Sequence, residues 1–206
     1  MRLVENETTW YRCFEEVPGV GYQGDPERRA KLPERHATPQ VQSFNFSGSR
    51  TASLSWPTLS GSTSASPVHE LAFGDYRKES SNHARERVLN ALELPGVLLD
   101  YHFAIQGIAE LLYQRRRAEP GNLAFIEWLA SWDARLVETH EQLFRVNQDG
   151  GGYFSVFAFG FLIDLHEREG YLHEALALAE RFSRFQPGDQ VEKLRARVAQ
   201  LRAEHD

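Results

Sequence analysis

The chain has 206 residues, of which 41% are hydrophobic and 25% charged, so it can form a core as one medium-sized domain or a domain with an appendage. Its formal net charge of −6 argues against a general nucleic-acid-binding protein, because recognition of phosphates needs a basic face. The single cysteine, Cys13, excludes an intrachain disulfide, and no apolar leader or bilayer-length apolar run is found, which predicts a cytoplasmic protein without membrane insertion.

Residues 1–79 are predicted to form an irregular arm, because Pro and Gly interrupt any long regular element. Within this arm, apolar residues recur at a spacing of two, Phe44 with Phe46 and Leu54 with Trp56, on either side of a Ser-Gly-Ser turn. This alternation predicts a β-hairpin. The competing interpretation is a flexible linker, since a Ser-rich stretch follows. Because exposed aromatic rings would be unfavourable, we expect the arm to lie partly against the helices.

Residues 80–206 are predicted to form an α-helical domain, so the expected fold class is mainly α. Apolar residues recur there every three or four positions, and short turns with Pro or Gly separate the runs. Short turns force neighbouring helices to be antiparallel, which predicts helical hairpins or a bundle. The expected helices cover residues 82–94, 97–117, 122–146, 153–169, 171–185 and 189–204.

Residues 156–189 carry three marker residues at characteristic distances. Gly170 lies at the turn between two predicted helices, Ala175 occupies a small contact position in the second helix, and Pro187 closes the unit. With this spacing the segment resembles one tetratricopeptide repeat, a helical hairpin of about 34 residues. The resemblance implies a module that binds protein segments on a concave helical face, and the alternative is a generic helical hairpin. The segment departs from the family's pattern at Ile163, His166, Leu172, Ala179 and Phe182.

No motif in the sequence indicates catalysis or metal binding. Gly19–Gly24 matches a dinucleotide fingerprint in letters, but the strand and helix that the fingerprint needs are missing. The His-Glu pairs lack the second histidine, four positions later, of a zinc-protease helix. A histidine site would need His166 and His173 together with His140 or Glu138, and ordinary polar roles for these residues are favoured. The sequence therefore predicts no metal and no cofactor.

The function favoured by the sequence is a non-enzymatic helical protein-interaction module or accessory subunit, which binds a protein partner or itself. Aromatic side chains dominate the energetics of interfaces. The aromatic residues of the helical region therefore supply the candidate binding residues, with core packing as the alternative for each. These candidates are Trp128, Trp132, Tyr153, Phe154 and Phe157.

Two other functions stay open. The chain could be an enzyme or small-ligand-binding protein with a pocket between the arm and the helices, although the absence of motifs argues against catalysis. Convergence of polar and aromatic side chains with perturbed pKa values in one cavity would favour it. The residues concerned are Tyr101, His102, Glu110, Trp132 and His140. Alternatively, the chain could be a subunit of a larger assembly, with an arm that becomes ordered on a neighbour.

Overall fold

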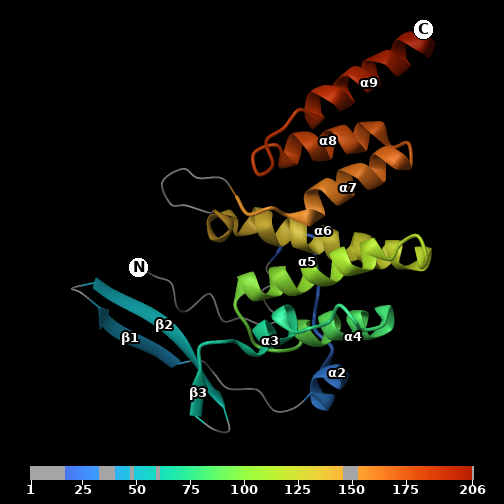
Figure 1. Ribbon diagram of the computed structural model, residues 1–206. Helices are drawn as coiled ribbons and strands as arrows, with labels where there is room; N and C mark the ends of the chain where they lie inside the picture. Colours follow the sequence, from blue (N-terminus) through green and yellow to red (C-terminus); the bar gives the residue numbers. More distant parts are fainter. Residues whose placement is uncertain (1–16, 33–39, 47–48, 59–60, 146–152, 206) are drawn as a thin grey trace. The chain divides into compact units, whose positions relative to one another are not determined.

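A computed structural model of the chain describes residues 17–32, 40–46, 49–58, 61–145 and 153–205 (Figure 1). The described residues form eight α-helices, which pack in adjacent pairs, and a small antiparallel hairpin. The predicted mainly-α class is therefore confirmed. The chain divides into two compact units, unit 1 (Met1–Leu112) and unit 2 (Tyr113–Asp206). The separation of an arm from a helical domain at residue 79, which was drawn from composition, stays a prediction.

The predicted β-hairpin is confirmed in unit 1. Strand β1 (Gln40–Phe46) pairs antiparallel with β2 (Ser49–Thr58), and Phe44 lies opposite Thr51. A third strand, β3 (Gly61–Thr63), pairs with the end of β2 and arises from the Ser-rich stretch that could also have been a linker. Trp56 on β2 is only 2% exposed, which agrees with the expectation that this ring is covered.

Three helices of unit 1 begin at capping side chains. Asp25 accepts a hydrogen bond from the backbone N–H of Arg28, and Ser66 and Ser80 each cap a later helix in the same way. A proline follows Asp25 and Ser66, which suits the first turn of a helix because its missing N–H is not needed there. These three are α2 (Pro26–Lys31), α3 (Pro67–Phe73) and α4 (Ser81–Leu92), and α5 (Leu98–Gln114) follows them.

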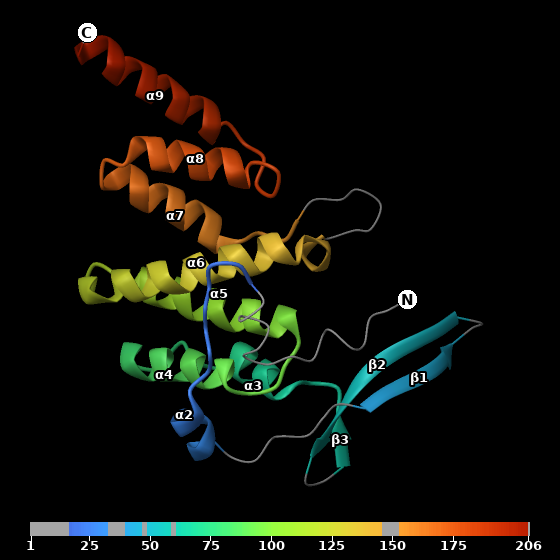
Figure 2. The same ribbon diagram turned by 180° about the vertical axis from the view of Figure 1, so that it is seen from behind.

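A buried carboxylate holds the segment around α2 against the end of α4. Figure 2 shows the ribbon of α2 beside that of α4. Glu93 is fully buried and accepts hydrogen bonds from the Tyr22 hydroxyl, from the Asp25 backbone N–H at 2.8 Å, and from two guanidinium nitrogens of Arg29 at 2.9 and 3.2 Å. Burial, together with the adjacent Glu93 carboxylate, raises the pKa of the Tyr22 phenol. Because α2 itself has no buried residue, polar contacts dominate its attachment.

Four successive helices pack on one another in unit 2 (Figure 1). Helices α6 and α8 run in the same direction, with α7 antiparallel between them, as the short turns in the sequence predicted. Phe159 lies in the core of this stack, where its ring stacks on Phe182 at 4.2 Å and lies 5.2 Å from Phe185. The four are α6 (Leu123–Thr139), α7 (Phe157–Arg168), α8 (Leu172–Phe182) and α9 (Gln190–His205).

Two predicted helix boundaries in unit 2 are wrong. Helix α6 ends at Thr139 rather than near residue 146, and a short 3-10 helix, Glu141–Phe144, follows it. Helix α7 begins at Phe157 rather than at Tyr153. The reason is a tertiary contact. The carbonyl of Phe144 accepts a hydrogen bond from the backbone N–H of Phe154, and Tyr153 forms a β-bridge with Arg145, so the chain is extended rather than helical at Arg145 and Tyr153.

The turn between α7 and α8 depends on the left-handed backbone of Gly170, which has φ +86°. Replacing Gly170 with alanine is expected to lower the free energy of unfolding by about 1 kcal/mol, because an L side chain is strained in that region. The added Cβ meets no other atom, so the backbone alone causes the loss. Chemical denaturation measures it. Gly188→Ala is the control, since that glycine also has open space and no positive φ. An equal effect of both changes would contradict the prediction.

Within the described residues, no helix is both long enough and apolar enough to cross a membrane.

Candidate functional site

Unit 2 has a surface hollow of about 300 Å³ between α6, α7 and α8, which we call the α6–α8 groove. Small side chains create the space: Ala134 on α6 and Ala177 on α8 leave room above α7. Apolar side chains line much of the remainder, including Leu162, Leu178 and Phe182. The polar lining residues are Ser131 and Arg135 of α6, His166 of α7, and Glu174 and Arg181 of α8.

An ion pair joins the two outer helices at one end of the groove. The Arg181 guanidinium donates two hydrogen bonds to the Glu138 carboxylate, at 2.6 and 2.5 Å. This fork-to-fork geometry is the strong form of the arginine–carboxylate pair. Because Arg181 is on α8 and Glu138 on α6, the pair fixes the position of one groove wall relative to the other.

The opposite end of the groove presents hydrogen-bond acceptors. Glu174 lies seven positions before Arg181 on α8, about 10 Å away along the helix axis, and its side chain is exposed. On α7, Nδ1 of His166 is 2.9 Å from the carbonyl oxygen of Leu162. A carbonyl only accepts, so the proton is on Nδ1 and Nε2 is an acceptor in the neutral ring. The groove therefore has an apolar middle between an ion pair and an acceptor-rich end.

The aromatic residues singled out from the sequence do not line this groove. Trp128 and Trp132 lie together on α6, with ring centroids 4.1 Å apart, and Phe125 is 5.3 Å from Trp128. Trp132 is only 7% exposed, so most of its surface contributes to the core. These two tryptophans form one cluster, and their role in partner binding stays a prediction.

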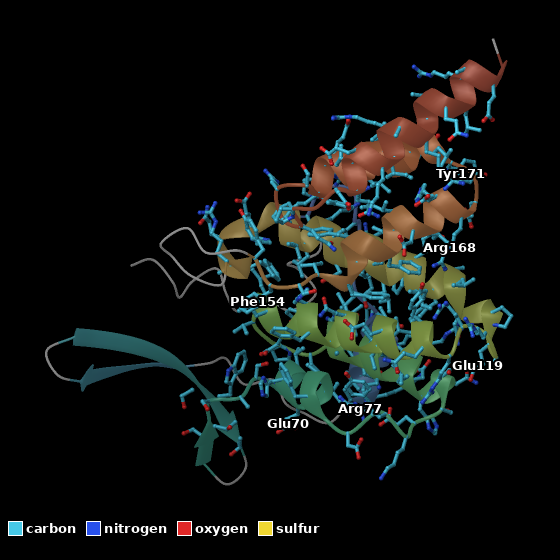
Figure 3. All side chains as sticks on the ribbon, turned by 45° about the horizontal axis from the view of Figure 1, so that its top comes forward. Glu70, Arg77, Glu119, Phe154, Arg168 and Tyr171 are labelled. Carbon is cyan, nitrogen blue, oxygen red and sulfur yellow. The ribbon has the colours of Figure 1, made fainter. Side chains whose placement is uncertain are left out.

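The other three candidates lie near the start of α7. Tyr153 packs edge-on against Phe185 at 4.9 Å, whereas Phe157 stacks on Phe161 at 5.5 Å. Phe154, in the segment before α7, is 38% exposed (Figure 3). Of the five aromatic candidates it has the most accessible ring, and partner binding by this residue also stays a prediction.

Tyr153 also contributes to a polar cluster. Its hydroxyl donates to the carboxylate of Glu141, and Arg145 donates to the same carboxylate at 2.9 Å. The hydrogen bond from Tyr153, followed by that from Arg145, lowers the pKa of Glu141. This arrangement ties the segment before α7 to the 3-10 helix after α6.

The residues of the enzyme hypothesis belong to both units. In unit 1, the Tyr101 hydroxyl donates to the carbonyl of Leu94 at 2.7 Å, and His102 is fully buried on the same helix. Burial raises the pKa of Glu110, also on α5. Trp132 and His140 belong to unit 2. Within unit 1, a hydroxyl committed to a backbone carbonyl and a buried imidazole do not form an open reaction site.

A Ser, a His and an Asp do meet in unit 1, but in the wrong order for nucleophilic catalysis. The Ser66 hydroxyl donates to Asp100 at 2.5 Å, and Nδ1 of His69 lies 3.1 Å from the other carboxylate oxygen. A catalytic triad needs the histidine between the serine and the acid, so that the imidazole removes the serine proton. Ser66 is 2% exposed and caps α3, so this cluster has a structural role.

The histidine site that the sequence left open also differs from a metal centre, because two of its possible ligands are engaged in hydrogen bonds. His166 is hydrogen-bonded through Nδ1 to a backbone carbonyl, and Glu138 is occupied by Arg181. Across the described part of the chain, no three His, Cys, Asp or Glu side chains come together in a way that could hold a metal ion.

The groove was not recognised from the sequence, which singled out His166 and Glu138 only as possible metal ligands. Ala177, Glu174 and Arg181 follow one another at helical spacing on α8, a signal of a shared face, but only the fold brings that face to α6. The structure is mainly helical with packed helix pairs. No protein-family model matches the chain, and no curated protein or solved structure gives a significant match to it.

Proposed function

We propose that the chain is a non-enzymatic helical protein-interaction module and that the α6–α8 groove is its binding surface. The supporting observation is the hollow of about 300 Å³ with an apolar middle and charged ends. Such a volume is at the small end of binding pockets, with room for one large side chain and parts of its neighbours. Anchoring of apolar side chains in a pocket with a polar rim is the usual way in which proteins recognise each other.

The helix pair of α7 and α8 supports a kinship with tetratricopeptide repeats as part of this proposal. Its turn is at Gly170, and Ala175 in α8 is fully buried, as a small contact residue would be. We further propose a cytoplasmic location for the chain, with a protein partner or a second copy as its ligand. Phe154 and Trp128 are the proposed contacts outside the groove.

Replacing Ala177 with arginine is expected to weaken partner binding strongly, because the long charged side chain would occupy the groove. Ala177 is exposed on α8, and arginine is a good helix former, so the fold should be retained. Retention of the partner from an extract of the native host should fall at least about tenfold, since the anchor would lose its pocket. Quantitative mass spectrometry of proteins retained by the tagged chain measures this loss, and light scattering detects self-association.

The matched control is Ala196→Arg on α9, an exposed alanine that does not line the groove. This variant should retain the partner as well as the unmodified chain does. Equal retention by the unmodified chain and by the Ala177 variant would overturn the proposed binding surface.

A further inference from the structure

We infer that the α6–α8 groove accepts a partner segment that presents a large apolar side chain next to a lysine or arginine. This inference rests on the proposed function and specifies the chemistry of the partner. Three features of the groove lead to it: the free acceptors at one end, the neutralised cation at the other, and the size of the apolar middle.

The acceptor-rich end selects a cation. Within the described part of the chain, the exposed Glu174 makes no hydrogen bond or ion pair. His166 donates a hydrogen bond from Nδ1–H to the carbonyl oxygen of Leu162. Its other ring nitrogen, Nε2, is therefore a second acceptor in addition to the Glu174 carboxylate. A lysine or arginine supplies donors and a positive charge to both groups, whereas a carboxylate would be repelled by Glu174.

The cations of the groove lie toward the other end. Arg181 is neutralised by two hydrogen bonds to Glu138, at 2.6 and 2.5 Å. Arg135 precedes Glu138 by one helical turn on α6 and therefore lies toward this ion pair. Helices α6 and α8 run in the same direction (Figure 1), and Arg181 pairs with Glu138. Glu174 is seven residues before Arg181 and Arg135 is three residues before Glu138, so the two are staggered along the groove. A basic side chain bound at Glu174 is therefore kept away from the positive charges of Arg135 and Arg181.

The apolar middle of the groove fits one anchoring side chain. Leu162, Leu178 and Phe182 supply the apolar surface, and Ala134 and Ala177 leave the space above it. A volume of about 300 Å³ holds one large aliphatic or aromatic side chain and parts of its neighbours. The apolar anchor and the adjacent basic residue thus occupy successive parts of one groove.

A displayed library of random 12-residue peptides, applied to the immobilised full-length chain, tests this chemistry. Retained peptides should be enriched in an aliphatic or aromatic residue next to lysine or arginine. Glu174→Gln should weaken these peptides about threefold to fivefold, and Glu174→Lys about tenfold, because reversal replaces attraction with repulsion. Glu169→Lys is the matched control, since it adds the same charge at an exposed position outside the groove, and should leave their binding unchanged.

Three results would overturn the inference: no retained peptides, retained peptides without a basic preference, or equal binding by the unmodified chain and the Glu174 variants. Partner retention by the Ala177→Arg variant separates such a failure from failure of the proposed function. If that variant loses the native partner while the peptides show no basic preference, the groove binds a partner of different chemistry. If that variant keeps the partner, the groove itself is not the binding surface.

Discussion

Replacing Glu93 with alanine is expected to lower the free energy of unfolding of unit 1 by about 3 kcal/mol, because the change removes one side of a buried charge pair. The Glu93 side chain is fully buried, whereas its partner Arg29 retains 25% exposure. Its loss would leave the Tyr22 hydroxyl and the Asp25 N–H without their acceptor. Since Arg29 can turn toward water, we place the cost at the lower end of the range for broken buried pairs.

Glu86→Ala, on the helix α4 that Glu93 terminates, is the matched control. Glu86 pairs with Arg28 of the same N-terminal segment, but its side chain is 57% exposed, so its removal should cost less than about 1 kcal/mol. Chemical denaturation measures both losses. Hydrogen exchange at residues 17–32 should increase strongly only in the Glu93 variant. Equal destabilisation by the two changes would show that burial of Glu93 does not determine how this segment is held.

Replacing Phe159 with alanine is expected to lower the free energy of unfolding of unit 2 by about 3–5 kcal/mol, the range for truncation of a buried phenylalanine. Phe159 is 1% exposed, and its ring stacks on Phe182 at 4.2 Å. Truncation loses the favourable free energy of burying the ring away from water and the packing contacts of the ring. It also leaves a cavity that neighbouring helices fill only in part. The midpoint of denaturation should shift while its dependence on denaturant stays similar.

Phe154→Ala is the control for this prediction, because it makes the same chemical change at a 38% exposed ring. It should change the free energy of unfolding by no more than about 0.5 kcal/mol. Comparable losses from the two substitutions would contradict the assignment of Phe159 to the core. A well-folded Phe154 variant also allows its proposed contact with a partner to be tested separately from stability.

Local signals explain why most helices could be predicted. Helix α4 follows a serine cap, and α7 and α8 meet at a glycine. At these positions the apolar periodicity and the capping or turn residues indicated the same helix boundaries. Helices α2 and α3 were missed although Asp25-Pro26 and Ser66-Pro67 mark their starts. Each has at most two turns, which is too short for an apolar period to be recognised, so the prolines were interpreted only as breakers.

The candidate site could not be predicted from the sequence, for a different reason. Arg181 and Glu138 are separated by 43 positions, so no motif links the ion pair that joins the groove walls. Likewise, Phe154 and Phe159 belong to one aromatic run in the sequence, yet the first is exposed and the second buried. The bridge between Arg145 and Tyr153 separates them by holding the chain extended before α7.

By itself, the sequence determined the mainly helical class and the helix pair that turns at Gly170, and it indicated the β-hairpin with a flexible linker as the alternative. Caps, apolar periodicity and turns depend on interactions between residues a few positions apart, so they can be recognised in the sequence. Only the tertiary structure decided that Glu93 is buried among donors and that Glu174, His166 and Ala177 share a groove with α6. Burial and ion pairing depend on contacts between distant parts of the chain, which the packing of whole helices creates.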